Sequence, residues 1–225
     1  MNYTTEHAKR DAEFFKAFAK DRTLDRATWN KKNPIKATKD STVKGFTDVP
    51  RDFTNVVSPS PLHKKLYTAL SGFCKKFPNQ QPPNLFLSGS TGAGKTYTAK
   101  VVANILLDRG FDVHFTTAFG MVNDFQKYVT SFGRDNHLID NLLECDILVI
   151  DDLGAEPTIR NVTMEHIYNV INERLSGNKP FIITSNLNPK QIDECYGQRI
   201  ASRILGNTTT SIELVGIDLR LEKTT

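Results

Sequence analysis

The chain contains the residues Gly89-Ser90-Thr91-Gly92-Ala93-Gly94-Lys95-Thr96, which fit the pattern G-x-x-x-x-G-K-[ST]. Directly before them, residues 84–88 form a short apolar run that ends in small residues and predicts a buried parallel strand. Directly after them, residues 97–109 predict a helix that ends at Gly110. A strand, a glycine-rich loop and a helix in this order are the context in which the pattern binds phosphate. The stretch therefore predicts a nucleoside triphosphate site.

The predicted loop supplies several kinds of contact to a triphosphate. Its glycines allow backbone N–H groups to point at phosphate oxygens, and the N-terminus of the following helix adds partial positive charge. Lys95 is expected to reach the β- and γ-phosphates, and Thr96 to offer its hydroxyl to Mg²⁺. The predicted ATP-binding residues are Gly89, Ser90, Thr91, Gly92, Ala93, Gly94, Lys95, Thr96 and Tyr97.

Composition indicates a globular protein. The 225 residues are 39% hydrophobic and 24% charged, which suits one α/β domain with a small extension. No apolar run approaches the ~20 residues that span a bilayer, and the first ten residues lack the apolar core of a signal peptide. We therefore expect a cytoplasmic protein without membrane contact.

The three cysteines form no C-x-x-C pair and the five histidines have no ligand spacing, so we expect neither a disulfide framework nor a zinc site.

The N-terminal fifth of the chain differs in charge from the rest. Residues 1–50 hold 11 Lys and Arg against 7 Asp and Glu, whereas residues 51–225 hold 18 of each kind. A basic arm of this kind either touches nucleic acid or an acidic partner, or is a solvated surface segment. The charge alone leaves both interpretations open.

The same part of the chain predicts a small helical extension. A helix is expected at 4–20, and its three phenylalanines either pack on the main domain or form a docking face for another protein. Residues 31–52 are polar and basic and contain two prolines, which is typical of a linker. We therefore predict an extension over 1–48 and the main domain over 49–225. The phenylalanines are Phe14, Phe15 and Phe18.

Strands and helices alternate along the main domain. We predict strands at 84–88, 112–116, 147–150, 180–186 and 211–214, and helices at 61–76, 97–109, 118–129, 136–144, 163–175 and 198–205. This alternation predicts an α/β fold with a parallel five-stranded sheet, helices on both faces and ligands at the carboxyl ends of the strands.

Two packing details follow from the apolar spacing. In the helix at 118–129, four apolar residues have a spacing that predicts a single buried face; they are Phe119, Val122, Phe125 and Val129. Upstream of the helix at 61–76, Phe53 and Val56 are expected either to wall a pocket for the nucleotide base or to pack in the core.

Polar side chains follow two of the buried strands. Asp151 ends the aliphatic run 147–150, which places its carboxylate beside the loop as a ligand for Mg²⁺. Asp152 follows it, where a carboxylate that activates water is expected. Asn186 ends the next strand, and its uncharged amide is suited to orient the attacking water.

Two arginines lie late in the chain on one predicted helix. Arg199 and Arg203 are four residues apart and share a helical face. If this face meets a neighbouring subunit, one of them reaches that subunit's triphosphate as an arginine finger. The alternative is a pair that forms surface salt bridges.

Taken together, these motifs resemble the AAA+ ATPases, and within them the bacterial helicase-loader family of DnaC and DnaI with the related IstB transposition ATPase. The resemblance covers about residues 50–220. It rests on the glycine loop, on Leu-Val-Ile-Asp-Asp-Leu-Gly-Ala-Glu at 148–156, on Ile-Thr-Ser-Asn at 183–186 and on Arg-Ile-Ala-Ser-Arg-Ile at 199–204.

The resemblance assigns a role to each predicted site residue. It makes Lys95 and Thr96 the Walker A pair, Asp151 and Asp152 the Walker B pair, and Asn186 sensor 1. It makes Arg203 the arginine finger, with Arg199 beside it. Because only 22 residues follow Arg203, it implies a sheet without the helical lid of most AAA+ proteins. Arg220 matches a late arginine of the family only weakly.

The family also implies partners. It implies self-association in the ATP-bound state, binding to a hexameric replicative DNA helicase through the N-terminal segment, and delivery of that helicase onto single-stranded DNA. The helix at 118–129 and the loop at 156–161 would face the DNA. Five residues either supply the charge and stacking for this contact or belong to the core or the ordinary surface: Phe115, Phe119, Lys127, Tyr128 and Arg160.

Two features depart from the family pattern. The extension lacks the cysteine set of loaders with a zinc-binding N-terminus. Asp152 stands where AAA+ motors commonly have glutamate and reaches one methylene less far, which predicts slow ATP hydrolysis that rises on assembly or with single-stranded DNA.

Three alternative functions are compatible with the motifs. The first is an IstB-like adaptor that binds DNA and directs a transposase. The second is a small-molecule P-loop kinase, and the third is a binding module in which ATP only switches conformation.

Overall fold

The computed structural model describes residues 46–56, 61–130, 136–156 and 162–214. Several predictions fall outside these residues: the helix at 4–20 with its phenylalanines, most of the linker, Arg160 and Arg220. Within the described residues, no helix is long and apolar enough to pass through a membrane.

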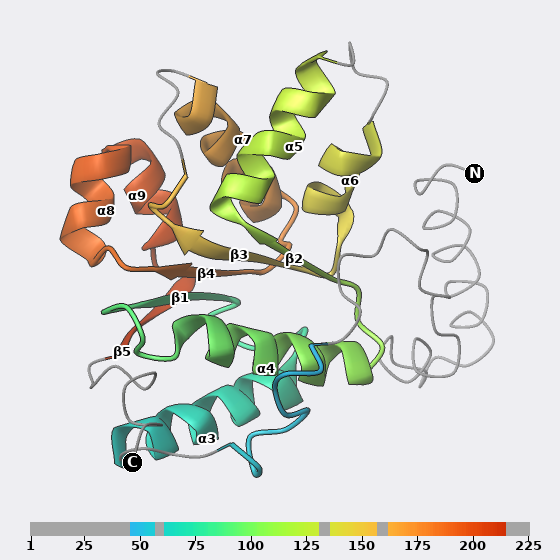
Figure 1. Cartoon of the computed structure of the whole chain (residues 1–225), viewed down its shortest axis with the longest axis vertical. Helices are drawn as coiled ribbons and strands as arrows, with labels where there is room; N and C mark the ends of the chain where they lie inside the picture. The colour runs from blue at the N-terminus through green and yellow to red at the C-terminus, as the bar shows by residue number, and fades with distance from the viewer. Residues whose placement is uncertain (1–45, 57–60, 131–135, 157–161, 215–225) are drawn as a thin grey trace.

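Five parallel strands form one sheet in the order β2-β3-β4-β1-β5 (Figure 1). The strands are β1 (Asn84–Gly89), β2 (Val113–Thr117), β3 (Ile147–Leu153), β4 (Phe181–Ser185) and β5 (Thr209–Leu214). The three central strands are buried almost throughout, as parallel strands covered on both faces should be. The predicted parallel α/β sheet is confirmed.

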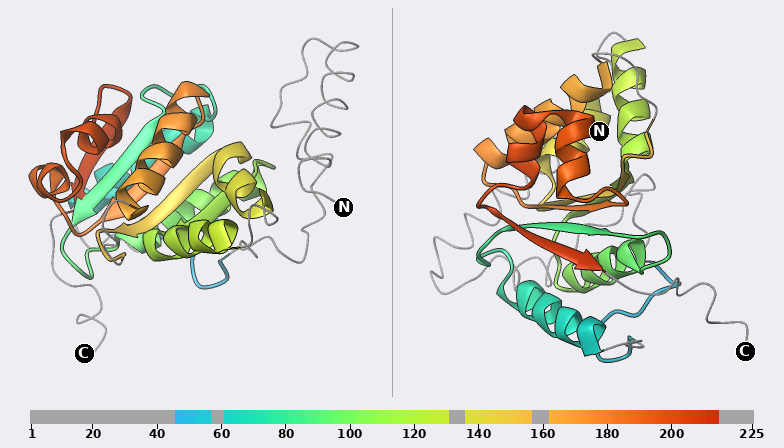
Figure 2. Two further views of the ribbon diagram at one scale, coloured as in Figure 1. Left: turned by 90° about the horizontal axis from the view of Figure 1, so that it is seen from above. Right: turned by 90° about the vertical axis from the view of Figure 1, so that its left-hand side faces the viewer.

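Figures 1 and 2 show that helices cover both faces of the sheet. One face carries α3 (Pro61–Lys76) and α4 (Lys95–Asp108). The other carries α5 (Ala118–Thr130), α6 (Asn136–Glu144), α7 (Val162–Ser176), α8 (Pro189–Tyr196) and α9 (Gln198–Ile204).

Two hydrophobic cores result, one on each side of the sheet. Because successive side chains of a strand point to opposite faces, Leu85 and Leu87 enter the core beneath α3 and α4, whereas Phe86 enters the other.

One predicted helix face and one omitted helix need correction. In α5 the buried residues are Ala118, Met121, Val122 and Phe125, whereas Phe119 is 50% exposed and Val129 is 59% exposed. The four residues expected on one face therefore do not share it. Helix α8 was not predicted, because it is short and buries only Ile192 and Tyr196. Its start signal is nevertheless complete: Asn188 caps it in a capping box with Gln191.

The segment 46–56, here called the leading segment, lies along α4. The buried side chain of Asn104 accepts a hydrogen bond from the Phe46 N–H (3.0 Å) and donates to the carbonyls of Phe46 (2.9 Å) and Val49 (3.3 Å). One turn earlier on α4, Lys100 pairs with Asp48 at 2.9 Å. The chain thus enters the domain along the helix that begins at the glycine loop, while the domain boundary near residue 48 stays a prediction.

Candidate nucleotide-binding site

The glycine loop joins β1 to α4 and adopts backbone angles that only glycine tolerates well. Gly92 and Gly94 have φ angles of 80° and 87°. Gly89 has a φ of 145°, and a Cβ placed there would lie 2.3 Å from the carbonyl oxygen of Leu214. Gly94 is the N-cap of α4 and offers no side-chain cap, so the first N–H groups of the helix face the loop. This arrangement suits an anion.

Lys95 lies at the centre of the loop and is only 6% exposed. Its ammonium group donates hydrogen bonds to the carbonyls of Gly89 (2.9 Å) and Ser90 (2.8 Å) and to Oδ1 of Asn186 (2.7 Å). The fold therefore brings Lys95 and Asn186 together from α4 and the end of β4. Tyr97, the last predicted binding residue, is partly buried and packs against the core beneath the sheet.

Asp151 and Thr96 form an oxygen-rich pair beside the loop. The Thr96 hydroxyl donates to Oδ1 of Asp151 at 3.0 Å, and the Thr184 hydroxyl donates to the same oxygen at 2.6 Å. Asp151 is 6% exposed, so its charge is held by these hydroxyls rather than by bulk water. A carboxylate and a hydroxyl at this spacing are the hard oxygen donors that Mg²⁺ prefers, and the residues present fit this ion.

Asp152 occupies an irregular position in β3. Its φ is 60°, and the pairing of β3 with β4 shifts between Ile150 and Leu153. This bulge re-aims the side chain, as bulges near functional sites do. The Asp152 N–H donates to the Thr184 hydroxyl at 2.9 Å, and its Oδ1 accepts from the Asn186 amide at 3.1 Å. Asn186 thus bridges the lysine and the second aspartate.

Sequence reasoning missed Thr184, which touches both aspartates. It is fully buried in β4. A threonine within an otherwise aliphatic strand was the available signal, but its importance depends on β4 lying next to β3. That neighbour relation follows from the strand order rather than from the local sequence.

A second unpredicted contact extends from the bulge toward α8. Glu156 accepts hydrogen bonds from the Gly154 N–H at 2.8 Å and from the Tyr196 hydroxyl. Burial, reinforced by the Glu156 carboxylate, raises the pKa of Tyr196, so the phenol stays protonated and donates. This contact links the loop after Asp152 to α8.

Arg199 and Arg203 contact a different part of the molecule. Both guanidinium groups lie over the ring of Tyr168 on α7, and Arg203 also donates to Asn172. Within the ranges that the structure describes, neither arginine forms an ion pair or contacts the glycine loop. Among the described residues, the two arginines therefore do not form the surface salt bridges of the alternative interpretation.

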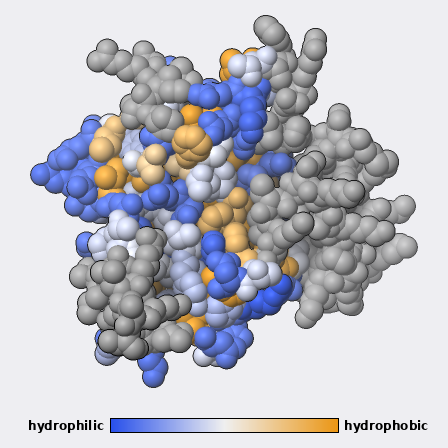
Figure 3. Space-filling model, in the orientation of Figure 1, coloured by the Kyte–Doolittle hydropathy of each residue, from blue (hydrophilic) through white to orange (hydrophobic). Residues whose placement is uncertain are grey.

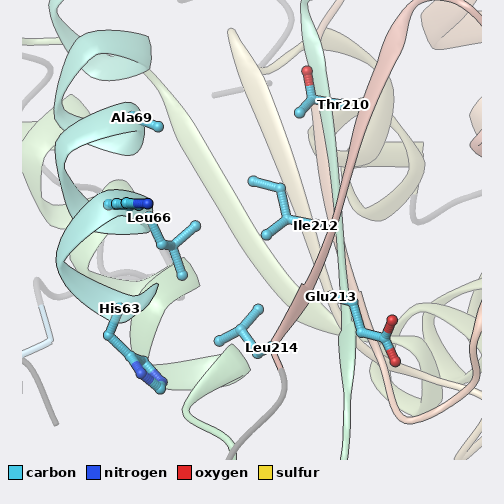
Figure 4. Close-up of a pocket in the computed structure, with 8 residues that line it drawn as sticks. His63, Leu66, Ala69, Thr210, Ile212, Glu213 and Leu214 are labelled. Carbon is cyan, nitrogen blue, oxygen red and sulfur yellow. The ribbon is translucent and has the colours of Figure 1, made fainter. Parts of the chain in front are cut away.

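A cavity of about 330 Å³ lies between α3 and β5, close to the loop (Figure 4). Its walls include His63, Leu66, Ile212 and Leu214, and Leu214 pairs with Gly89 in the sheet. The lining is largely apolar. Phe53 and Val56 do not line it: Phe53 stacks on Tyr67 with centroids 5.3 Å apart, and Val56 is buried in the adjoining core.

Comparison with known proteins identifies the family. Residues 4–219 match the family model described as IstB-like ATP binding protein. The chain belongs to this family. The matched range includes the glycine loop, both aspartates and the arginine pair, and the predicted resemblance is confirmed.

Named relatives of this IstB-like chain act in replication. The chromosomal replication initiator protein DnaA of Aliarcobacter butzleri is 29% identical over 170 residues, which are 74% of this chain and 36% of DnaA. The replicative helicase loader DnaC of Buchnera aphidicola is 27% identical over 151 residues (65% of this chain, 60% of DnaC). DnaC of Escherichia coli K12 is 28% identical over 127 residues (56% and 51%). The matches thus span about a third to three fifths of these relatives.

Solved structures show the same fold. The DnaC helicase loader superposes with a TM-score of 0.63 at 21% identity, covering 73% of this chain and 96% of DnaC. DnaI superposes with a TM-score of 0.61 at 24% identity (77% and 95%). AMPPCP-bound DnaA from Aquifex aeolicus gives 0.62 at 18% identity (73% and 49%). The IstB-like chain therefore has the AAA+ fold of these proteins.

Proposed function

We propose that this IstB-like protein is an ATP-dependent loader, which binds a hexameric replicative helicase and places it on single-stranded DNA. The observation that carries the proposal is the hydrogen-bonded set around the glycine loop, in which Lys95, Asn186 and Asp152 are linked, and Thr184 joins Asp152 to Asp151. The similarity to proteins named as replicative helicase loaders supports the choice of partner.

The residues of the site divide the chemistry between them. Lys95 and the loop N–H groups would hold the β- and γ-phosphates of ATP, and Thr96 with Asp151 would hold Mg²⁺. The ion supplies charge neutralisation at the phosphates when it is bound. Asp152 would accept a proton from the attacking water, and the hydrogen bond from the Asn186 amide to the Asp152 carboxylate (3.1 Å) supports this role because it orients the carboxylate.

Hydrolysis by a single copy is expected to be slow. Asp152 is shorter than the usual glutamate, and the arginine pair contacts α7 rather than the loop of its own chain. A neighbouring copy would have to supply an arginine. We therefore propose ATP-dependent self-association, with hydrolysis that rises on assembly or with DNA.

The proposed DNA face lies on α5. Phe119 and Val129 are exposed apolar residues of this helix, which also carries the exposed Lys127, an ion-pair partner of Asp124 at 3.3 Å. An exposed aromatic ring can stack on a base, and a lysine that exchanges its carboxylate partner for a phosphate can contact the backbone of single-stranded DNA. The basic segment 1–48 is the proposed contact with the helicase.

The partner can be tested by native mass measurement of the full-length chain mixed with a hexameric replicative helicase and ATP. We expect a complex of the hexamer with several copies of the chain, and loading of the helicase onto circular single-stranded DNA. Lys95→Ala should abolish both. Lys100→Ala is the matched control, because this lysine lies on the same helix but contacts Asp48 instead of the loop.

The outcomes separate the candidate functions. No complex with the helicase, or an undiminished complex in Lys95→Ala, would refute the loader proposal. Membership of the IstB-like family keeps one second candidate, the adaptor that directs a transposase, which the resemblance to IstB implies. The adaptor candidate predicts that native mass measurement with a transposase and duplex DNA in place of the helicase and single-stranded DNA detects a complex. If Asp152→Asn loads normally while Lys95→Ala does not, ATP acts as a switch and hydrolysis is dispensable.

A further inference from the structure

The arginine pair of α9 is held in place by one aromatic ring on α7. The guanidinium carbon of Arg199 lies 3.9 Å from the centroid of the Tyr168 ring, and that of Arg203 lies 4.6 Å from the same centroid. A guanidinium over an aromatic face is stabilised by the negative charge of the ring surface. One ring therefore holds two cations close to each other.

Asn172 completes the arrangement one turn further along α7. Its Oδ1 accepts hydrogen bonds from Nε of Arg203 (3.0 Å) and from the Tyr168 hydroxyl (3.4 Å). Nη1 of Arg203 donates to the backbone carbonyl of Arg199 at 2.9 Å. Both pairs of residues are four positions apart on their helix, so Tyr168 and Asn172 of α7 lie on one face and meet Arg199 and Arg203, which lie on one face of α9.

The pair lacks a counterion in the described part of the chain. No carboxylate lies within ion-pair distance of either guanidinium there, and Nη2 of Arg203 makes no hydrogen bond to the described residues. Two adjacent cations without a carboxylate repel each other. Such a pair is suited to a multiply charged anion, because guanidinium groups bind phosphate oxygens through paired N–H donors.

Packing between the two helices does not require these polar contacts. Ile200 and Ile204 of α9 are buried, and so are Ile167 and Ile171 of α7. The contacts of Tyr168 with the arginines lie at the rim of this apolar interface, where Arg199 is exposed. The surface over α8 and α9, on the left of Figure 3, is mostly hydrophilic and accessible.

We infer that Tyr168 and Asn172 are positioning residues, which hold Arg199 and Arg203 as a preformed receptor for the terminal phosphate of ATP bound to a neighbouring copy of the chain. This inference rests on the proposed function for the identity of the anion. The receptor geometry itself rests only on the contacts between α7 and α9. Pre-organisation of this kind lowers the cost of ordering two long side chains when the anion arrives.

A first experiment tests the receptor without any ATP hydrolysis. The full chain carrying Lys95→Ala is titrated with inorganic triphosphate, and the Nε–H signals of the two arginines are followed by NMR. We expect saturable shifts. Tyr168→Leu should weaken the affinity at least fivefold, whereas Tyr168→Phe keeps the ring and should leave it within twofold. The absence of shifts, or equal affinity in Tyr168→Leu, would overturn the inference.

Asn172→Asp separates positioning from mere packing. The new carboxylate would pair with Arg203, so the midpoint of thermal unfolding should stay unchanged or rise while the affinity for triphosphate falls at least fivefold. A purely structural role predicts that affinity follows stability. Unchanged affinity for triphosphate in a stable Asn172→Asp protein would therefore contradict the inference. If Tyr168→Leu does not fold, Asn172→Asp still tests the inference.

A mixing experiment tests whether the anion belongs to a neighbour. Tyr168→Leu alone should lose at least tenfold in kcat with KM within twofold, because its own loop is intact. Lys95→Ala alone should be inactive. Mixing the two should restore hydrolysis, since the loop of one copy meets the arginines of the other, and absence of rescue would overturn the assignment to a neighbour. If the wild-type chain forms no complex with the helicase, the proposed function fails, and the triphosphate titration still decides whether the receptor exists. If it binds ATP without hydrolysing it, the affinity for triphosphate in the first experiment decides the inference.

Discussion

The hydroxyl of Thr184, an uncharged residue, forms hydrogen bonds with both Asp151 and Asp152. It donates to Oδ1 of Asp151 at 2.6 Å and accepts from the Asp152 N–H at 2.9 Å. It thereby sets the orientation of the predicted Mg²⁺ ligand and the backbone angle of the predicted base at the same time. Groups that hold a ligating carboxylate in this way contribute strongly to metal affinity.

Thr184→Val should therefore damage the site more than the fold. We expect a loss of about 10–100-fold in the rate of ATP hydrolysis or in Mg²⁺ affinity, the range found for groups that orient metal ligands. Single-turnover hydrolysis at several Mg²⁺ concentrations measures it. Thr184→Ser keeps the hydroxyl and is expected to retain most activity. A Thr184→Val protein that hydrolyses ATP at the wild-type rate would show that the hydroxyl is dispensable.

Arg174 is a fully buried cation that serves the fold rather than the site. Its guanidinium donates to the carbonyls of Leu142 (2.9 Å), Cys145 (3.2 Å) and Pro180 (2.7 Å). These acceptors belong to the last turn of α6 and to the residues leading into β3 and β4. One side chain thus satisfies carbonyls that would otherwise be buried without donors.

Arg174→Leu should lower the free energy of unfolding by at least about 3 kcal/mol, because several buried carbonyls lose their donor at once. Urea denaturation measures the change. Arg174→Lys keeps the charge and some of the hydrogen bonds, so an intermediate loss is expected. A loss below about 1 kcal/mol in Arg174→Leu would mean that water replaces the guanidinium.

At the scale of elements, α4 joins the glycine loop to the leading segment. Lys100, Asn104 and Asp108 lie on one face of this helix. Lys100 pairs with Asp48, Asn104 donates to carbonyls within residues 46–50, and Asp108 pairs with Arg51. The helix that would hold phosphate at its first turn thus also fixes the point at which the N-terminal part of the chain meets the domain. A shift of α4 would be transmitted to that junction.

Asn104→Leu tests how firmly the leading segment is held. The substitution leaves the Phe46 N–H and three carbonyls, those of Phe46, Val49 and Pro50, without their partner, and we expect a loss of about 2–3 kcal/mol in stability. Limited proteolysis should cut the segment at least about tenfold faster, since cleavage follows the population of the opened segment. Lys100→Ala removes a partly exposed ion pair with Asp48 and the contact of the ammonium with the Phe46 ring, 5.0 Å from its centroid, and should cost about 1 kcal/mol. Equal effects of the two substitutions would contradict the assigned role of Asn104.

At the scale of the whole molecule, burial of titratable groups sets the pH range of stability. Burial lowers the pKa of His114 and of His166 from the usual 6.5, so their contribution is complete above that value and is lost as the pH falls. Burial raises the pKa of Cys145 to about 11 and of Cys74 to about 12, from 9.0. Their contribution is complete below 9.0 and is lost as the pH rises toward these values.

The fold should therefore be most stable between about pH 7 and 8.5 and weaken on both sides. Urea midpoints measured from pH 5 to pH 10 test this expectation. Cys74→Ala removes one of the buried thiols and should flatten the alkaline side without changing the acidic side. A stability that does not change over this range would show that these groups titrate alike in the folded and unfolded states.

The local sequence was sufficient for most features that depend on neighbours along the chain; the omitted helix α8 is the exception. The glycine loop, the strand before it and the helix after it were predictable because backbone angles and apolar runs are set within a few residues. The five strands and their parallel arrangement followed from the same alternation. Helix α8 was equally accessible through its cap at Asn188, but its few apolar residues made the periodic signal weak.

Only the tertiary structure decided which side chains meet across strands and helices. Thr184 reaches both aspartates because the strand order in the sheet places β4 beside β3. Phe119 is exposed because α5 presents a different face to the sheet than its spacing predicted. Tyr168 lies under Arg199 and Arg203 because α7 and α9 pack together. The sequence by itself determined the phosphate loop and the class of fold, since both depend on local geometry. The partners of the charged groups depend on packing between distant segments, which no local pattern contains.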